Sequence, residues 1–320
     1  LSLISTGDPY AIASWGAWSC QGYWVWRWKD HIDRKFMRRF QALATNTKVM
    51  QPSLTDGAAI TKVDEEDTLS MRCGGCGAKI GAKVLANVLQ RLPTTTHPDV
   101  LLGTEYADDA AILQVPVGKV LVQSVDYFRA FTQDAYLLGA IAVNHALGDL
   151  YAMGAQPQSA LAIATIPYAR PAIVEQTLYE LLSGAVEVLV QSQAALVGGH
   201  SSEGAELAFG VTVNGTVDPK AVWRKDGLQP GDALVLTKPI GTGTLLAADA
   251  QGKAKGYWVE QAMATMLLSN QQAQTVLQQY AVHACTDVTG FGLLGHLLEM
   301  LQASQLCAQL DIQALPLLEG

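Results

Sequence analysis

Two short apolar runs rich in β-branched residues stand out near the middle of the chain. Ala110–Val115 and Val120–Val125 are separated by the four residues Pro116–Lys119. Apolar runs of this length on either side of a short loop with proline and glycine are typical of a β-hairpin. The hydrophobic pattern therefore predicts two antiparallel strands joined at this loop.

The register of this hairpin brings acidic residues together at its open end. When the two valines that flank the loop are paired, Asp109 lies opposite Asp126 and Asp108 lies opposite Tyr127. Opposed carboxylates repel each other unless a cation or a hydrogen-bond donor lies between them. The pair is therefore either a cation site or two solvated turn aspartates, and the hairpin pattern alone leaves both interpretations open.

A helix is predicted over Gln133–Met153, where apolar residues recur at helical spacing. Asp134 is a candidate N-cap residue, and Gly154 is a candidate for the position that follows the C-cap. On this helix His145 and Asp149 are four residues apart and share a face. They form either a structural hydrogen bond or part of a site in which Asp149 faces a metal ion.

Strand and helix patterns alternate in the next segment of the chain. The expected strands are Leu161–Ile166, Ala194–Val197 and Ala208–Val217, and a helix is expected at about Ala172–Gln191. Apolar strands that alternate with long amphipathic helices indicate an α/β (α+β) fold.

Glycine-rich bends follow two of the apolar runs. Gly198–Ser201 has the sequence GGHS, which predicts a turn suited to phosphate or nucleotide contact. Trp223–Gly243 contains a predicted turn at Pro230-Gly231-Asp232, a strand that reaches Leu236, and a second glycine-rich bend. Lys238 in that bend is either solvated or in contact with phosphate.

A further aspartate lies in a segment rich in threonine and glycine. His283–Gly295, with the sequence HACTDVTGFGLLG, is predicted to end one helix and to precede another. Asp287 could cap the second helix at Thr289 or Gly290. It could equally be another carboxylate of the site suggested by Asp109 and Asp126.

Met71–Gly81, with the sequence MRCGGCGAKIG, is the segment with the clearest nucleophile. Its glycines free the backbone to approach a ligand, and Lys79 follows Cys76 by three residues. A neighbouring lysine lowers the pKa of a thiol and so favours the nucleophilic thiolate. Cys73 and Cys76 also form a CxxC pair, so redox pairing and a purely structural glycine loop remain alternatives, whereas zinc is disfavoured because the other cysteines are isolated.

The N-terminal segment differs in composition from the rest. Ile32, Phe36 and Phe40 make an apolar helical stripe that is surrounded by basic residues. Such a helix, within residues 15–42, either lies on a membrane surface or packs on a domain. The segment also resembles the C-terminal tail of type II NADH dehydrogenase-like flavoproteins, although it contains no strand, GxGxxG and helix unit for a dinucleotide. The polar stretch 49–70 that follows is predicted to be a linker.

Length, hydrophobic content, cysteine count and net charge exclude several classes of protein. A chain of 320 residues that is 49% hydrophobic is long enough for two packed domains. It has no apolar run long enough to cross a bilayer and no visible signal peptide, which favours a cytoplasmic protein. The five cysteines are scattered, which favours reduced thiols over disulfides. A net charge of −8 argues against a nucleic-acid surface and is compatible with binding of divalent metal ions.

Seven motifs, taken in order, carry a family resemblance. They are CGAKIG, ADDAAIL, QSVDYF, NHALGDLYAMGAQP, VGGHSS, TKPIGTG and ACTDVTGFGLLGHLLEM. In this order they resemble selenophosphate synthetase (selenide, water dikinase) of the PurM-like ATP-binding superfamily, over residues 70–320. The resemblance implies conversion of ATP, selenide and water to selenophosphate, AMP and phosphate with Mg²⁺ and potentially K⁺, in a homodimer with a mixed or antiparallel sheet covered by helices on one face.

The resemblance also implies roles for individual residues. Cys76 and Lys79 would be catalytic, with Lys79 in contact with phosphate. Metal ions would be held by Asp109, Asp126, Asp149 and Asp287. The residues expected to contact the nucleotide, directly or through metal, are Lys79, Tyr106, Ala107, Asp108, Asp126, Asp149, Gly198, Gly199 and His200.

The sequence departs from the family pattern at two positions and in its extent. Ala78 stands where family members often have a second cysteine, and His145 stands where asparagine is usual. The expected organisation is a flavoprotein-like tail at 1–48, the linker, a PurM-like half at 71–217 and an incomplete second half at 218–320, as in an interior piece of a fusion protein. The alternatives are another PurM-like enzyme, such as aminoimidazole ribonucleotide synthetase or thiamine-monophosphate kinase, and a nucleotide-binding module without activity.

Overall fold

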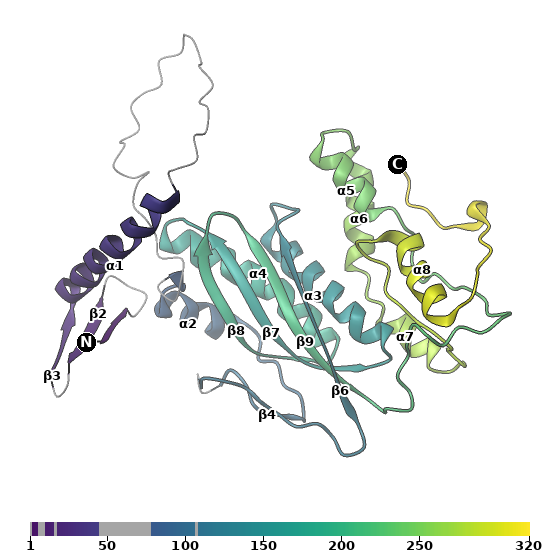
Figure 1. Cartoon of the computed structure of the whole chain (residues 1–320), viewed down its shortest axis with the longest axis horizontal. Coiled ribbons are helices and arrows are strands. Elements are labelled where there is room, and N and C mark those ends of the chain that lie inside the picture. The colour runs from purple at the N-terminus through teal and green to yellow at the C-terminus, as the bar shows by residue number, and fades with distance from the viewer. Residues whose placement is uncertain (1, 6–9, 16–17, 45–77, 106–107) are drawn as a thin grey trace, which may run out of the picture. The chain divides into compact units, whose positions relative to one another are not determined.

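The computed structural model describes residues 2–5, 10–15, 18–44, 78–105 and 108–320 (Figure 1). The chain divides into two compact units, Leu1–Ala86 and Asn87–Gly320. The predicted linker at 49–70 lies outside the described residues, as do Cys73, Cys76, Tyr106 and Ala107.

The first unit contains a three-stranded antiparallel sheet followed by a long helix. The elements are β1 (Ser2–Ser5), β2 (Ala11–Trp15), β3 (Trp18–Gly22) and α1 (Tyr23–Ala44), with the strands in the order β1-β2-β3. Ala11, Ala13 and Val25 form a small core between β2 and α1. No helix among the described residues is long and apolar enough to cross a membrane.

The second unit is built on a four-stranded mixed sheet. Its strands are β6 (Val120–Arg129), β7 (Gln156–Pro167), β8 (Ala195–Gly204) and β9 (Ala208–Val217). They lie in the order β6-β9-β7-β8, in which only β7 and β8 are parallel. Helices α3 (Ala135–Ala152) and α4 (Pro171–Gln191) pack together behind the sheet, α3 on β6 and β9 and α4 on β7 and β8 (Figure 1). The predicted mixed sheet with helices on one face is confirmed.

Strand pairing contradicts the predicted hairpin. β5 (Ile112–Leu113) pairs with β4 (Val100–Leu102), whereas β6 pairs with β9 over its whole length. The turn at Pro116–Lys119 does form, closed by a hydrogen bond from the Lys119 N–H to the Pro116 carbonyl. The hairpin prediction is wrong because β9 offers β6 a longer antiparallel partner, and nothing in the local sequence reveals that partner.

Small residues let α3 and α4 approach each other closely. A Cβ atom on Gly139 would lie 1.9 Å from the carbonyl oxygen of Leu181, and one on Gly184 would lie 2.0 Å from that of Tyr136. Only glycine fits at both positions, because an added methyl group would overlap the facing backbone. The C-terminal turn of α2 (Ala82–Arg91) also packs on α4, where Arg91 lies 3.6 Å from the ring centroid of Tyr179.

The other helices of the second unit come after β9 in the chain. They are α5 (Thr242–Ala250), α6 (Gly256–Leu267), α7 (Gln271–Leu277), α8 (Gly292–Ser304) and a 3₁₀ turn at Ile312–Ala314. The predicted strand to Leu236 is wrong: Leu234 and Val235 are exposed, and no strand lies beside them among the described residues. The helix expected to end near His283 ends earlier, at Leu277.

Candidate active site

Strand β6 places Asp126 under helix α3. Exposure alternates along the strand, so that Val125 and Tyr127 are exposed while Ser124, Asp126 and Phe128 are partly covered. Successive side chains of a strand point to opposite faces of the sheet. The covered set therefore faces α3, which packs against β6.

Helix α3 supplies the partners of this covered set. The predicted shared face of His145 and Asp149 is confirmed, because both side chains meet residues of β6. The Ser124 hydroxyl donates a hydrogen bond to Oδ2 of Asp149, and Nε2 of His145 lies 3.9 Å from Oδ2 of Asp126. The His145 ring also packs against Phe128 at 82°, with 4.9 Å between the ring centroids.

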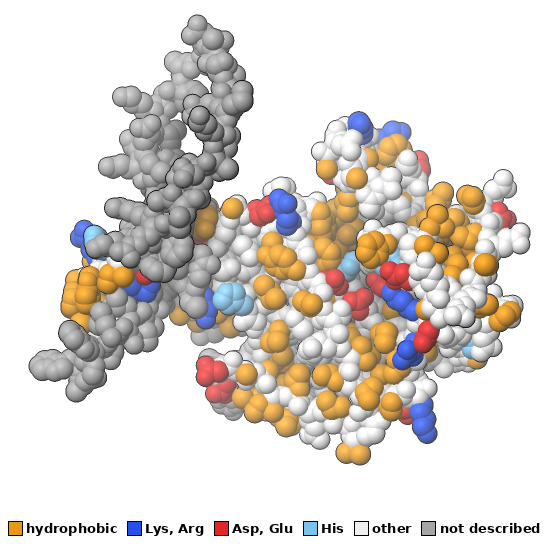
Figure 2. Space-filling model, viewed as in Figure 1, with side chains coloured by type: hydrophobic (Ala, Val, Ile, Leu, Met, Phe, Trp, Pro, Cys, Tyr) orange, Lys and Arg blue, Asp and Glu red, His pale blue; other side chains and the backbone are white. Residues whose placement is uncertain are grey.

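Asp287 joins the same cluster from the segment between α7 and α8. Burial raises the pKa of Asp126 above its ordinary value, the positive charge of protonated His145 lowers it, and the negative charges of Asp149 and Asp287 raise it further. Because the effect of a charge on a pKa weakens with distance, Asp149 and Asp287 each lie within electrostatic range of Asp126. Figure 2 shows acidic side chains in the surface between α3 and α8.

The capping interpretation of Asp287 is wrong. The N-cap residue of α8 is Phe291, and no side chain makes a capping hydrogen bond there. The carboxylate is therefore not used to start the helix, which leaves it available to the cluster. We call Asp126, Asp149 and Asp287 the carboxylate cluster.

The chemistry of this cluster suits a hard cation that brings ligands of its own. Its donors are carboxylate oxygens that repel one another, which favours a cation between them. In the part of the chain that the structure describes, no three His, Cys, Asp or Glu side chains form a metal site by themselves. Mg²⁺ fits such an open arrangement, because it is usually bound by one or two carboxylates together with water and phosphate oxygens.

Asp108 and Asp109 are placed differently from the predicted arrangement. Both are exposed on the bend that precedes β5. Asp109 does not face Asp126 across a hairpin, and it is not among the charges that shift the pKa of Asp126. Their roles in metal and nucleotide binding remain predictions.

The glycine pair at 198–199 lies inside strand β8, so the predicted turn is wrong. Gly198 and Gly199 have φ values of +152° and +155°, and the pairing of β7 with β8 shifts register beside them. A Cβ atom on Gly199 would lie 2.0 Å from the carbonyl oxygen of Ala162, so the glycine is needed for close strand approach. His200 is exposed on this strand, at the sheet edge opposite β6. Nucleotide contact by these residues remains a prediction.

The predicted catalytic loop is described only at its end. Lys79 is exposed in the first unit, just before α2, while the carboxylate cluster belongs to the second unit. Cys76, like Tyr106 and Ala107, lies outside the described residues. The catalytic roles of Cys76 and Lys79 therefore stay predictions.

Two residues near the cluster were missed by sequence reasoning. Ser124 binds Asp149, and the alternation of β6 could have revealed it, because Ser124 and Asp126 are two residues apart on one strand. Cys285 was counted only as a scattered thiol. Burial, together with the charge of Asp287, raises the pKa of Cys285 to about 11, so its thiol stays protonated at neutral pH.

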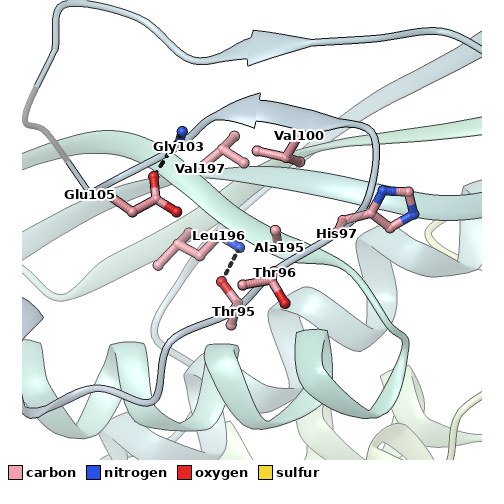
Figure 3. Close-up of a pocket in the computed structure, with 9 residues that line it drawn as sticks. All are labelled: Thr95, Thr96, His97, Val100, Gly103, Glu105, Ala195, Leu196 and Val197. Carbon is pink, nitrogen blue, oxygen red and sulfur yellow. Dashed lines mark hydrogen bonds between the residues drawn. The ribbon is translucent and has the colours of Figure 1, made fainter.

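A small cavity of about 50 Å³ lies between the segment before β4 and strand β8 (Figure 3). Beside it the Leu196 N–H donates to the Thr95 hydroxyl at 2.8 Å, and the Gly103 N–H donates to Glu105 at 3.0 Å. The cavity shares no residue with the carboxylate cluster. It is far too small for a nucleotide.

Two family models match the second unit. The AIR synthase related protein N-terminal domain matches residues 107–217, and the corresponding C-terminal domain matches residues 229–320. The thiamine-monophosphate kinase of Stenotrophomonas maltophilia is similar in structure, with a TM-score of 0.60 and 26% identity, over 73% of this chain and 74% of that one. These matches confirm the PurM-like fold.

Curated relatives agree with the family models. The selenide, water dikinase of Desulfitobacterium hafniense is 41% identical over 231 residues, which is 72% of this chain and 67% of the relative. That of Clostridioides difficile is 38% identical over 248 residues, which is 77% of this chain and 70% of the relative. The chain therefore belongs to the selenide, water dikinase family of AIR synthase related proteins.

Proposed function

We propose that this chain uses ATP to convert selenide and water to selenophosphate, AMP and phosphate. The reaction breaks both phosphoanhydride bonds of ATP, so that one phosphoryl group is transferred to selenium and the other to water. Family membership supports the reaction class. The observation that carries the proposal is the carboxylate cluster. In it, Asp149 of a helix and Asp287 of the C-terminal half both raise the pKa of Asp126, which lies on a strand.

The carboxylate cluster would bind ATP through Mg²⁺. The polyanionic substrate and the repelling carboxylates of Asp126, Asp149 and Asp287 are compatible only if cations lie between them. Bound Mg²⁺ supplies charge neutralisation at the transferring phosphoryl group. Asp126 and Asp149 would hold the ion from the first half of the fold, Asp287 would hold it from the second, and Asp109 would complete the set. K⁺ is a further candidate cation.

Cys76 and Lys79 would act on the other reactants. Lys79 would contact phosphate and stabilise the negative charge that shifts during transfer. Cys76, three residues before this lysine in a glycine-rich sequence, would bring selenium to the phosphoryl group while water is excluded. Ala78 excludes a second thiol directly before the lysine.

A homodimer would form through the face of the sheet that points away from α3 and α4. Leu121, Val125 and Tyr127 of β6 are exposed on the face opposite α3. An apolar sheet face without a covering layer is typical of an interface, and a second copy would cover it. Val125→Glu should therefore lower the mass measured by sedimentation, whereas Val190→Glu on the exposed side of α4 should not.

The N-terminal unit would rest on an anionic membrane surface. Trp24 and Trp28 of α1 are 58% and 42% exposed, and Ile32 continues this stripe. The helix carries six Lys or Arg against two Asp, in a chain whose net charge is −8. In a flotation assay the protein should rise with phosphatidylserine vesicles, whereas the Trp24→Ser/Trp28→Ser variant should stay in the dense fraction. Equal flotation of both would contradict this role.

Selenide-dependent AMP release, followed together with ³¹P NMR, tests the proposed reaction. The wild-type protein should form selenophosphate and one AMP per turnover, and Cys76→Ser should lose both. Equal product from the two proteins would contradict the thiol role. Phosphorylation of thiamine monophosphate without any response to selenide would instead assign the chain to the chemistry of its structural neighbour.

A further inference from the structure

Helix α6 ends at a group of carbonyl oxygens that need donors. The last four carbonyl groups of a helix have no partner within the helix. Here Lys238 donates from Nζ to the Leu268 carbonyl at 2.6 Å and to the Thr265 carbonyl at 3.2 Å. The lysine of the glycine-rich bend is therefore engaged by the protein backbone, in the manner of a cation at a helix C-terminus.

A second donor reaches the same carbonyl group from the other half of the fold. Asn144 of α3 is only 6% exposed, and its Nδ2 donates to the Met266 carbonyl at 2.7 Å and to the Leu268 carbonyl at 3.1 Å. Leu268 is thus a shared acceptor for Asn144 and Lys238. The arrangement joins the region matched by the N-terminal family domain to the region matched by the C-terminal one.

The charge of Lys238 is not matched by a carboxylate. Burial alone lowers its pKa, and among the described residues no carboxylate forms an ion pair with it. In the part of the chain that the structure describes, the carbonyl dipoles of Thr265 and Leu268 stabilise this partly buried ammonium. Its removal would leave the carbonyls of Thr265 and Leu268 without this donor, a loss that an apolar substitute cannot repair.

The two sides of α3 connect this arrangement to the carboxylate cluster. Asn144 contacts the end of α6, while its neighbour His145 and, one turn later, Asp149 contact β6. Asp287 comes from the same half as Lys238. We propose that Lys238 and Asn144 are positioning residues that fix the C-terminal half on α3 and thereby hold Asp287 beside Asp126.

The first test is structural and needs no substrate. In Lys238→Met, hydrogen exchange should rise at the end of α6, in α3 around Asn144 and in the segment that contains Asp287, but not in α4. Lys253→Met is the matched control, because Lys253 is exposed and its side chain donates to Gln251, another exposed surface residue. Faster exchange confined to α6 would show a simple helix cap and would overturn the proposal.

The second test follows MgATP affinity and rests on the proposed function. Lys238→Met and Asn144→Ala should each weaken MgATP binding about tenfold, which corresponds to about 1.4 kcal/mol. If Lys238 acts through Asp287, Lys238→Met should cost no further affinity in an Asp287→Asn background. Lower thermal stability with unchanged MgATP affinity would overturn the proposal.

The two tests distinguish a failure of the proposed metal site from a failure of the positioning role. If Asp287→Asn alone leaves MgATP affinity unchanged, the metal role of the cluster fails, while the exchange experiment still decides the positioning role. Lys238→Gln provides a second variant if Lys238→Met does not fold, because the amide can still donate to one carbonyl. It should give a smaller change in exchange with the same distribution, and a change limited to α6 would again contradict the proposal.

Discussion

The imidazole Nε2 of His145 lies 3.9 Å from Oδ2 of Asp126, at the point where α3 crosses β6. The ring is held edge-on against Phe128, so its position is fixed by packing as well as by charge. His145 is the one basic group among the charges that shift the pKa of Asp126, while Asp149 and Asp287 act in the opposite sense. His145 therefore offsets part of the negative charge that these carboxylates bring together.

Asp126→Asn should stabilise the protein in the absence of metal. The pKa of Asp126 is raised in the folded state, so ionisation disfavours folding, and stability falls as pH rises from the ordinary carboxyl range through the raised pKa. At pH 7 the variant should melt a few degrees higher, about 2–4 °C, and the difference should vanish near pH 4. Scanning calorimetry at both pH values without Mg²⁺ checks this.

Asp249→Asn serves as the control for that prediction, because Asp249 is exposed on α5. It should leave the melting temperature unchanged at both pH values. A lower melting temperature for Asp126→Asn at pH 7 would mean that Asp126 makes a stabilising contact, contrary to its raised pKa.

Ser124→Ala should weaken Mg²⁺-dependent ATP binding without preventing folding. The hydroxyl orients the Asp149 carboxylate, and loss of one such hydrogen bond is worth about 1 kcal/mol, or roughly fivefold in affinity. Ser124→Thr keeps the hydroxyl and should restore binding. Ser183→Ala on α4 is the control, because the buried Ser183 hydroxyl has no partner among the described residues. Equal loss in the Ala and Thr variants would point to packing.

Gly139→Ala should destabilise the second unit strongly. The added methyl group would lie 1.9 Å from the Leu181 carbonyl oxygen and would force α3 and α4 apart, at a cost of about 2–4 kcal/mol. Gly148→Ala on the same helix meets nothing within 4 Å and should stabilise by about 0.5–1 kcal/mol. Urea unfolding measures the stability of both variants. Similar changes in the free energy of unfolding would contradict the close approach of α3 to α4.

Cys285 should resist alkylation at neutral pH. Its pKa of about 11 keeps the thiol protonated, and only the thiolate reacts readily. Reaction with iodoacetamide, followed by peptide mass spectrometry, should be slow at pH 8 and should accelerate toward pH 11. Asp287→Asn removes one cause of the raised pKa and should speed the reaction at pH 8. If Cys285 reacts as fast as exposed Cys307 at pH 8, the burial argument fails.

Local patterns predicted the elements that their own sequence determines. The periodicity of α3 with its Asp134 cap, the helix α4 and the strand Ala208–Val217 all agree with the structure. Asp134 accepts the predicted capping hydrogen bond from Leu137. Each of these depends on residues within a few positions of one another, and this is the range over which spacing rules hold.

Local patterns could not predict which strands pair with each other. Val120–Val125 is a strand as predicted, but its partner β9 lies about 90 residues away, and only the folded chain brings the two together. A Gly-Gly pair such as Gly198-Gly199 is compatible with a turn and with an irregular strand pairing, so its sequence does not distinguish the two. The approach of Asp287 to Asp126 likewise depends on how the second half docks on α3, so the local sequence left it as one of two alternatives beside a helix cap.

The central claim is that acidic side chains bind ATP through a shared cation, and calorimetric titration of ATP with and without Mg²⁺ tests it most directly. Binding by the wild-type protein should require Mg²⁺, and Asp126→Asn and Asp149→Asn should each weaken it at least about tenfold, while Asp249→Asn should not. ATP affinity that is the same in EDTA, or that survives both substitutions in the cluster, would contradict the account.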